Sequence, residues 1–482
     1  MISARRLAAN IFSGVFTNIF RVATQLVMLP LMARLLGPSQ LGLYAIALPL
    51  INFVLLLSDA GIGDSLAKEK SGRSLVWSSA VWGLLATAVV GCLTVNAVSH
   101  VIARLSNQPG LPMIILPLSM TLLLVAITIV PSALMMREGN LVPAAVSDTL
   151  GTASGAVIGV TLALDGFGVW SLVGQYLGGY AVRAVAYNVA QPFVPKLEFS
   201  ARSLFEHSGM GGQILLSRQA ELGISMTERS RISLKLGAAA VGSYANASQV
   251  GLFTSNSVGS PIWANLYFIA LHRSKDEVAA ALLKYHRLFA LTVFPAATLF
   301  AIATPMAVPI MLGPKWAAST GPIMAMVLLS PFGNLGALHS AIYYAYGLGR
   351  YVLYGQLGML LFRLIVVLAL WQYGVLGLSM GLGLAGLGYY IMTNLLAARK
   401  IGVNPISLFG VVTAPLISSA AAGATFRQFV SLHGSFWTAV LGGALSMLVY
   451  AICMLLIDRR RIVHDLDMAL AMVRRPYKEV LA

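Results

Sequence analysis

Three arginines lie deep inside long apolar runs, where a permanent charge is costly and usually serves a function. They are Arg21, Arg218 and Arg363. Arg21 lies about ten residues into its run, which is roughly 15 Å of helix. An arginine stays protonated in such surroundings and presents a fork of donors that matches a phosphate group. The three therefore predict substrate binding through phosphate in a water-filled cavity, unless each one pairs with a carboxylate or extends toward the membrane surface.

Three acidic residues in or near the same kind of run are candidates for ion coupling or gating. They are Asp59, Asp148 and Glu221. A carboxylate in a low-dielectric environment holds a proton more tightly than in water, so it could carry a coupling proton. A simple ion pair is the alternative. Glu221 follows Arg218 by three residues, which suits a pair on one helix face.

Other residues of these runs have less specific uses. Asn18, Thr24, Gln25 and Gln175 could contact sugars, although hydrogen bonds between helices are their commoner use. Pro30 permits the first run to bend and is our candidate hinge.

Motifs of catalysis and of cofactor or metal binding are missing from the sequence. It contains no Walker loop, no Gly-x-Ser-x-Gly nucleophile motif and no zinc motif. The two cysteines, Cys92 and Cys453, both fall inside apolar runs and form no disulfide framework. We therefore expect no enzymatic activity, no cofactor and no metal site.

The composition is that of a membrane protein. Of the 482 residues, 58% are hydrophobic and 10% are charged, and the mean hydropathy is +0.82. Soluble domains carry about 25% charged residues. The net charge of +16 would suggest nucleic acid on a soluble protein. Here the Lys and Arg of cytoplasmic loops explain it, so no nucleic-acid partner is expected.

Apolar runs of about 20 residues mark transmembrane helices. We place fourteen of them near 11–33, 41–62, 75–99, 113–135, 142–164, 168–190, 209–232, 243–268, 286–312, 321–346, 352–371, 375–398, 406–426 and 436–457. The fold class is therefore all-α and polytopic. The weakest of these spans is 209–232, because it holds Arg218, Glu221 and Glu228.

The distribution of basic residues predicts the orientation. With both termini in the cytoplasm, 21 of the 32 Lys and Arg fall on the cytoplasmic side, 7 on the outer side and 4 within spans. This ratio agrees with the excess of positive charge on the inner side of membranes. It favours an even number of spans in an inner, or plasma, membrane.

Two connections and the tail lie on the predicted cytoplasmic side. Residues 191–208 contain two prolines and look like a linker, and residues 269–285 are expected to form a short amphipathic helix. The tail from Asp458 has one apolar face between basic clusters, so we expect it to lie on the anionic inner leaflet.

A repeated segment organises the chain. LGPSQLGLYAIA, from Leu36 to Ala47, returns as LGAAAVGSYANA, from Leu236 to Ala247, at an offset of 200 residues. At that offset Glu221 is equivalent to Arg21, so the two could pair across the halves. Duplicated halves around a shared site are typical of transporters. The expected parts are an N-lobe at 1–190, a linker at 191–208, a C-lobe at 209–400, two extra spans at 401–457 and a basic tail at 458–482.

The stretch from Ala33 to Lys70 resembles the polysaccharide-transporter (Wzx-like) branch of the MOP flippase superfamily. That branch typically shows Ala-Arg-Leu-Leu-Gly-Pro, then Phe-Gly-Leu-Tyr, where this chain has Leu41 in place of Phe. The second hairpin is similar to the LG…VG-x-Y segment of the family's second lobe. The resemblance implies two six-helix lobes in a V around a cationic lumen. Only the residue type of Arg21 carries over from the family's lumen.

The resemblance also implies a substrate, an undecaprenyl-diphosphate-linked oligosaccharide that is flipped from the inner to the outer leaflet. Membrane lipids, and a polysaccharide polymerase with its export machinery, are the implied partners. A multidrug or cation antiporter shares this fold, but its cavity would need carboxylates. A lipid II flippase is close in mechanism. A membrane-embedded glycosyltransferase would need paired acids or a large loop with a metal or base site, and the sequence has neither.

Overall fold

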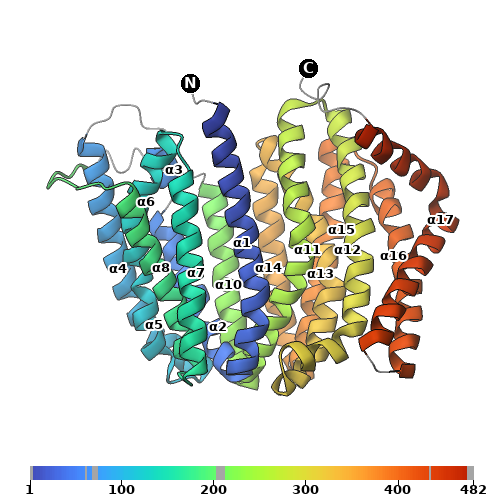
Figure 1. Cartoon of the computed structure of the whole chain (residues 1–482), viewed down its shortest axis with the longest axis horizontal. Helices are drawn as coiled ribbons and strands as arrows, with labels where there is room; N and C mark the ends of the chain where they lie inside the picture. The colour runs from blue at the N-terminus through green and yellow to red at the C-terminus, as the bar shows by residue number, and fades with distance from the viewer. Residues whose placement is uncertain (1–3, 60–61, 68–73, 202–211, 434–435, 475–482) are drawn as a thin grey trace. The chain divides into compact units, whose positions relative to one another are not determined.

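The computed structural model describes residues 4–59, 62–67, 74–201, 212–433 and 436–474, and these residues form helices and connecting turns without a strand (Figure 1). Each predicted span coincides with a helix, or in one case with the pair α5 and α6. The helices are α1 (Ala4–Leu36), α2 (Pro38–Asp59), α3 (Ile62–Leu66), α4 (Ser74–Ser106), α5 (Leu111–Ser119), α6 (Thr121–Arg137), α7 (Val142–Leu164), α8 (Val169–Ala190), α10 (Gly212–Leu236), α11 (Ala238–His272), α12 (Lys275–Met311), η1 (Pro314–Ser319), α13 (Thr320–Ala345), α14 (Gly349–Leu370), η2 (Trp371–Tyr373), α15 (Gly374–Ile401), α16 (Pro405–His433) and α17 (Phe436–Arg474).

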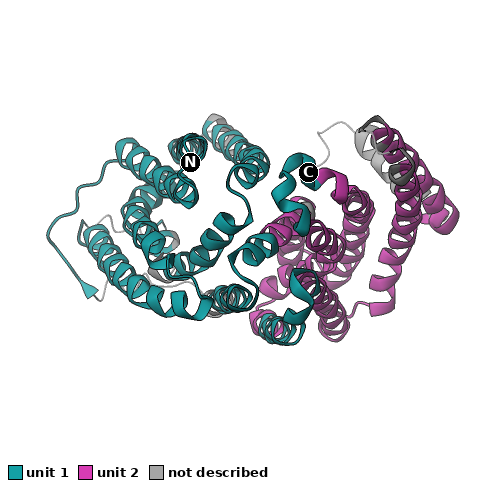
Figure 2. Cartoon of the chain, turned by 90° about the horizontal axis from the view of Figure 1, so that it is seen from below, with its two compact units in different colours: residues 1–245, 308–319, 356–378 teal, residues 246–307, 320–355, 379–482 magenta. Residues whose placement is uncertain are grey.

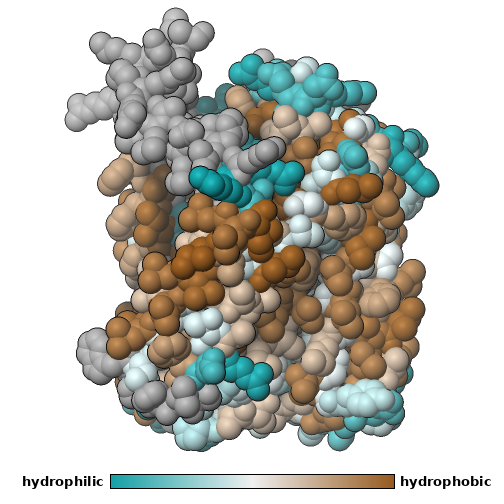
Figure 3. Space-filling view, turned by 90° about the vertical axis from the view of Figure 1, so that its right-hand side faces the viewer, coloured by the Kyte–Doolittle hydropathy of each residue, from teal (hydrophilic) through white to brown (hydrophobic). Residues whose placement is uncertain are grey.

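Ten segments of the described chain are long and apolar enough to cross a membrane. One of them covers both α14 and α15, while α8, α10 and α11 fall outside the ten. Those three helices carry many polar side chains, and α10 alone holds Glu221, Glu228 and Arg229. Figure 3 shows the apolar surface of one face as a broad band, with hydrophilic residues gathered at both ends. The all-α, multi-pass membrane fold is thus confirmed.

The predicted amphipathic helix at 269–285 is wrong as a separate element. The helix α11 continues to His272, and α12 runs from Lys275 to Met311 without a break. The start of α12 is set by Ser274, whose amide and hydroxyl donate to Glu277 at 3.0 Å each. This reciprocal capping arrangement satisfies amides that a helix start leaves unpaired. A single helix therefore carries both the amphipathic segment and the span that follows it.

The tail helix continues from the last span after a kink. Asp458 has non-helical backbone angles inside α17, with φ −137° and ψ 38°. Asp458 is also the residue at which the predicted tail begins, and the position of that tail on the inner leaflet stays a prediction. By contrast, α1 continues as one helix through Pro30 to Leu36.

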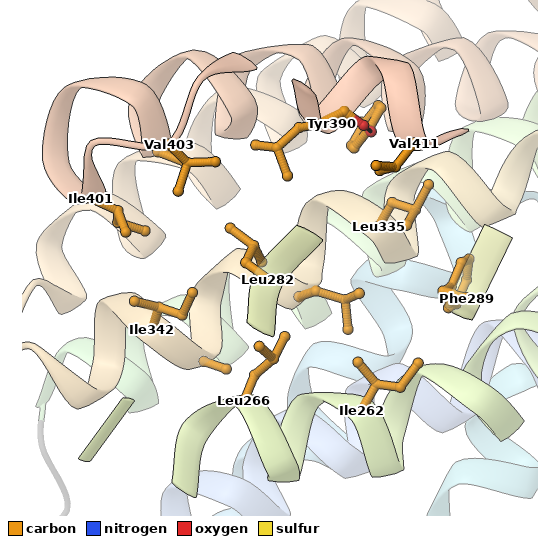
Figure 4. Close-up of a cluster of buried hydrophobic side chains, with 14 of the residues drawn as sticks. Ile262, Leu266, Leu282, Phe289, Leu335, Ile342, Tyr390, Ile401, Val403 and Val411 are labelled. Carbon is orange, nitrogen blue, oxygen red and sulfur yellow. Dashed lines mark hydrogen bonds between the residues drawn. The ribbon is translucent and has the colours of Figure 1, made fainter. Parts of the chain in front are cut away.

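The chain divides into two compact units, which Figure 2 colours separately. Unit 1 consists of residues 1–245, 308–319 and 356–378, and unit 2 of residues 246–307, 320–355 and 379–482. The core of unit 2 is a large cluster of buried aliphatic and aromatic side chains, part of which is drawn in Figure 4. The lobe boundaries expected from the repeat stay a prediction.

Glycines let two helices of unit 1 approach each other closely. A Cβ on Gly155 of α7 would lie 2.6 Å from the backbone oxygen of Gln175 on α8, and one on Gly151 would lie 2.8 Å from that of Gly179. Larger residues cannot occupy such positions without moving a backbone. The close packing of α7 and α8 is what holds their polar residues side by side.

Candidate functional site

The two copies of the repeated segment form equivalent helix turns in unit 1. Gly37 ends α1 with φ +79° and Gly237 ends α10 with φ +84°, a left-handed conformation that glycine adopts without steric cost. The amide of Gly37 donates to the carbonyl of Ala33 at 3.0 Å, and that of Gly237 donates to Ser233 at 2.8 Å. Equivalent residues of the repeat thus make the same turn twice.

The two turns pack against each other through a pair of glycines. A Cβ on Gly42 would lie 1.8 Å from the carbonyl oxygen of Ala238, and a Cβ on Gly242 would lie 2.0 Å from that of Pro38. Pro38 and Ala238 are themselves equivalent at the offset of 200 residues. The contact therefore has local two-fold symmetry, and no residue other than glycine fits at its centre.

Segments from other parts of the chain brace both turns. The indole of the fully buried Trp316, in η1, donates to the carbonyl of Ala33 at 2.8 Å. Ser319 and Ser243 hydroxyls lie 2.8 Å apart, and the Ser233 hydroxyl donates to the carbonyl of Ser106 at 2.7 Å. The turns are therefore fixed relative to η1 and to the end of α4.

Beside the second turn lies a group of buried ionisable side chains that we call the charge cluster: Glu228, Arg229, Tyr244 and Arg363. Arg363 of α14 donates from Nε and Nη2 to the two carboxylate oxygens of Glu228, at 2.8 and 2.7 Å. The Glu228 side chain is 1% exposed and that of Arg363 is 15% exposed. The guanidinium fork of Arg363 is thus occupied by a carboxylate from α10.

A second arginine gives the charge cluster an excess of positive charge. Arg229 of α10 donates to the carbonyl of Ala45 on α2, and it interacts electrostatically with Glu228, Arg363 and Tyr244. The cluster has two guanidinium groups and one carboxylate. It ties α2, α10, α11 and α14 together within unit 1.

A separate ion pair joins α7 and α8. Arg183 Nε lies 2.7 Å from Asp148 Oδ1, and the Tyr187 hydroxyl donates to the same oxygen at 3.1 Å. The guanidinium also lies over the ring of Tyr187, 5.5 Å from its centroid. Both charged side chains remain about one-third exposed, at 38% and 34%. Asp148 is therefore accessible but already has a cationic partner.

Arg21 lies on a polar stripe of α1. The helical period places Asn18, Arg21 and Gln25 on one face, and all three are exposed. The exposed residues Phe12, Phe16 and Ile19 share a different face. Arg21 Nη2 donates to Asn18 Oδ1 at 2.8 Å, and no carboxylate within the described part of the chain pairs with it. Its charge is therefore available to a ligand.

The remaining predicted site residues are placed only in part. Arg218 lies in α10 and Asp59 ends α2, but both side chains lie outside the described residues. Glu221 is exposed on α10 and interacts electrostatically with Arg363. Arg21 and Arg363 have separate partners, so the shared arginine cavity stays a prediction, as do the coupling roles and the hinge at Pro30.

Sequence reasoning missed the partner of Arg363. In the sequence, Glu228 is one of the charges that make the span at 209–232 the weakest of the fourteen, and nothing in the sequence indicates its partner. The helix continues to Leu236 and brings Glu228 and Arg229 into the charge cluster. The available signal for the charge cluster was the pair of opposite charges next to each other within one run. No group of three or more potential metal ligands occurs among the residues that the structure describes.

Comparisons with known proteins find relatives for most of the chain. A family model described as "Polysaccharide biosynthesis protein" matches residues 31–320. The succinoglycan biosynthesis transport protein ExoT of Rhizobium meliloti is 25% identical over 352 residues, which cover 72% of this chain and 71% of that protein. The lipopolysaccharide biosynthesis protein WzxC of Escherichia coli is 25% identical over 329 residues, which cover 65% of each.

The fold is also that of a solved flippase. The lipid II flippase MurJ in an inward closed conformation superposes with a TM-score of 0.73, over 94% of this chain and 99% of that one. The sequence identity is 12%, so this likeness describes the fold alone.

Proposed function

This chain belongs to the polysaccharide biosynthesis protein family, and we propose that it is a flippase for a lipid-linked oligosaccharide, the repeat unit of an exopolysaccharide, O-antigen or capsule. The observation that carries the proposal is sequence similarity, over most of the chain, to proteins named for succinoglycan transport and lipopolysaccharide biosynthesis. The protein itself changes no covalent bond of the glycan. Polymerisation and later export belong to partner proteins.

The proposed substrate is an undecaprenyl-diphosphate-linked oligosaccharide, and Arg21 is the residue best placed to bind its diphosphate. Its guanidinium is exposed and one of its N–H groups donates to an uncharged amide, so the other N–H groups remain for phosphate oxygens. Asn18 and Gln25 on the same stripe suit the adjoining sugars. Arg218 is a second candidate contact. The fork of Arg363 is filled by Glu228, which favours a positioning role for Arg363.

Transport proceeds by alternating access in this proposal. The duplicated halves open the transport path to one side of the membrane at a time, and a proton or another ion drives the cycle. Asp59, Asp148 and Glu221 remain candidates for coupling or gating, and Pro30 remains the candidate hinge. The excess of basic residues on one side supports cytoplasmic termini and an inner-membrane location.

A cation antiporter is supported less well by the same side chains. Such a transporter needs carboxylates that are free to meet a cation. Among the carboxylates of the described helices, Glu228 and Asp148 are both paired with arginines, and the exposed Glu221 interacts electrostatically with Arg363. The likeness to a lipid II flippase describes the fold, so lipid II serves as the competing substrate in the test.

The test uses purified protein in lipid vesicles that contain a fluorescent undecaprenyl-diphosphate-linked oligosaccharide. We expect the label to move between leaflets only in vesicles that contain the protein, and to be recovered without elongation or cleavage. Fluorescent lipid II in matched vesicles is the competitor. Movement of lipid II without movement of the oligosaccharide would refute the substrate, and a cleaved or elongated glycan would refute the absence of catalysis.

A further inference from the structure

Two histidines face each other in the interior of unit 2. His286 of α12 and His339 of α13 are both 0% exposed. Their ring centroids lie 4.9 Å apart, with the rings nearly perpendicular. The three helices around them, α12, α13 and α15, all belong to segments that are long and apolar enough to cross a membrane. Titratable residues are costly to bury inside membrane spans, and those that occur there usually serve a function.

The hydrogen bonds of the rings define their tautomers. His286 Nδ1 lies 2.9 Å from the carbonyl oxygen of Leu282, and His339 Nδ1 lies 3.2 Å from that of Gly336. A carbonyl oxygen only accepts, so each Nδ1 carries the hydrogen and donates it. Each neutral ring then presents a lone pair at Nε2. Nε2 of His286 has no hydrogen-bond partner within the described chain, and His339 has the amide group of Asn394 beside it.

A third polar side chain meets the histidines from α15. Asn394 is 0% exposed and interacts with both His339 and Tyr390. Neither atom of its amide group makes a hydrogen bond of good geometry with another described residue. The Tyr390 ring is 6.1 Å from that of His286. Unpaired polar atoms from three helices thus gather around the histidine pair, which is the arrangement expected of a site that takes up a small polar ligand.

The surroundings explain why that ligand would be a proton. The buried hydrophobic cluster of unit 2, part of which is drawn in Figure 4, includes Leu282, Phe289 and Leu335, which are close in sequence to the histidines. The cluster contains tyrosines from four helices: Tyr267 of α11, Tyr285 of α12, Tyr343, Tyr344 and Tyr346 at the end of α13 or just after it, and Tyr390 of α15. The nearest charge in sequence is Arg287 of α12, which pairs with Asp458 of α17. Within the residues that the structure describes, no carboxylate forms an ion pair with either histidine; the polar contacts of the two rings are to the carbonyls of Leu282 and Gly336 and to Asn394.

We propose that His286 and His339 form a proton-binding site whose loading and release are coupled to the conformational cycle. In the packed arrangement the two rings are neutral, because a charge in this apolar interior has no partner. Protonation at Nε2 then requires a conformation that admits water. The proton comes from water on one side of the membrane and returns to water on the other, and no covalent bond of the substrate changes. The coupling of this site to transport rests on the proposed flippase function.

Proton binding itself is tested without any substrate. Purified protein with 15N-labelled histidine is titrated by NMR from about pH 8, near the top of the range in which histidine normally changes charge, down to the pH at which the protein unfolds. In the wild type we expect the Nε2 signals of the two buried histidines to shift over the same pH range. In His286→Gln and in His339→Gln, the signal of the histidine that is left should shift over a different pH range. His272→Gln is the matched control, because its ring makes the same contact to a carbonyl four residues earlier but lies exposed. If neither buried ring titrates before the protein unfolds, the proposal is wrong.

Coupling is tested in vesicles with an internal pH dye. Wild-type protein should move protons when the lipid-linked oligosaccharide is added, and a pH gradient should speed lipid movement by about tenfold, within the range usual for coupled sites. His286→Phe and His339→Phe, which keep an aromatic ring but remove both ring nitrogens, should move lipid at the rate without a gradient. Lipid movement with no effect of the gradient would overturn the coupling alone, whereas titration without lipid movement would overturn the proposed function alone. Tight binding of Zn²⁺ at the pair would replace the proton site with a metal site.

Discussion

Arg21 and Arg363 have the same chemistry and similar depth in their apolar runs, yet their surroundings differ completely. Arg21 lies on an exposed polar stripe of α1 and contacts the amide of Asn18. Arg363 lies in the charge cluster and donates twice to a carboxylate that is 1% exposed. The first guanidinium is available to a ligand, while the second holds helices together. A charge within a membrane span is therefore a marker of function or of architecture, and its partner decides which.

The largest expected effect is on transport through Arg21. Arg21→Ala should abolish flipping of the lipid-linked oligosaccharide, because the charge that meets the diphosphate is lost. Arg21→Lys should keep a fraction of the rate, since the charge survives but the bidentate fork does not. The measurement is leaflet exchange in vesicles at equal protein abundance. Arg104→Ala, at an exposed arginine near the end of α4, is the control. Normal transport by Arg21→Ala would remove Arg21 from the site.

The next effect is on stability in the charge cluster. Glu228→Gln leaves the guanidinium groups of Arg229 and Arg363 without their carboxylate, which for a buried pair costs about 3–5 kcal/mol. Thermal unfolding in detergent should show a large fall in Tm, while Glu277→Gln at an exposed position should not. If Glu228→Gln has the Tm of the wild type, the ion pair of Arg363 does not stabilise the fold, and the contrast with Arg21 is wrong.

The glycine contact tests what positions the charge cluster. Gly42→Ala would place a Cβ 1.8 Å from the carbonyl oxygen of Ala238, so the two turns must separate, at a cost of about 1–3 kcal/mol. Because Ala45 on the same helix accepts from Arg229, the separation should also weaken the cluster. Gly14→Ala in α1 is the matched control, since its Cβ would meet no atom within 4 Å. Equal stability of the two variants would contradict a tight contact.

The smallest expected effect on stability is at the half-exposed pair of α7 and α8. Asp148→Asn should cost about 0.2–1 kcal/mol, because solvent already screens both charges. The same variant separates architecture from gating when its transport rate is measured as well. A strong loss of transport with near-normal unfolding supports gating by Asp148, whereas unchanged transport leaves it a simple ion pair.

The sequence by itself determined the class of fold and the repeat. The length of apolar runs is a local property set by membrane thickness, so each predicted span coincides with a helix. The segments from Leu36 and from Leu236 identified equivalent turns, because the left-handed glycine that ends a helix is also a local requirement. The polar stripe of Asn18, Arg21 and Gln25 follows from helical periodicity alone.

The tertiary structure decided which residues meet. Glu228 and Arg363 are 135 positions apart, and nothing in either run specifies that α10 and α14 pack in the register that joins them. The same holds for the contact of Gly42 with the second turn and for the pairing of His286 with His339. Hydropathy predicts that a residue lies in the membrane. It does not say which of the distant helices the side chain of that residue faces. The partner of a buried charge, and with it the difference between a ligand site and a structural ion pair, is fixed only when the helices pack.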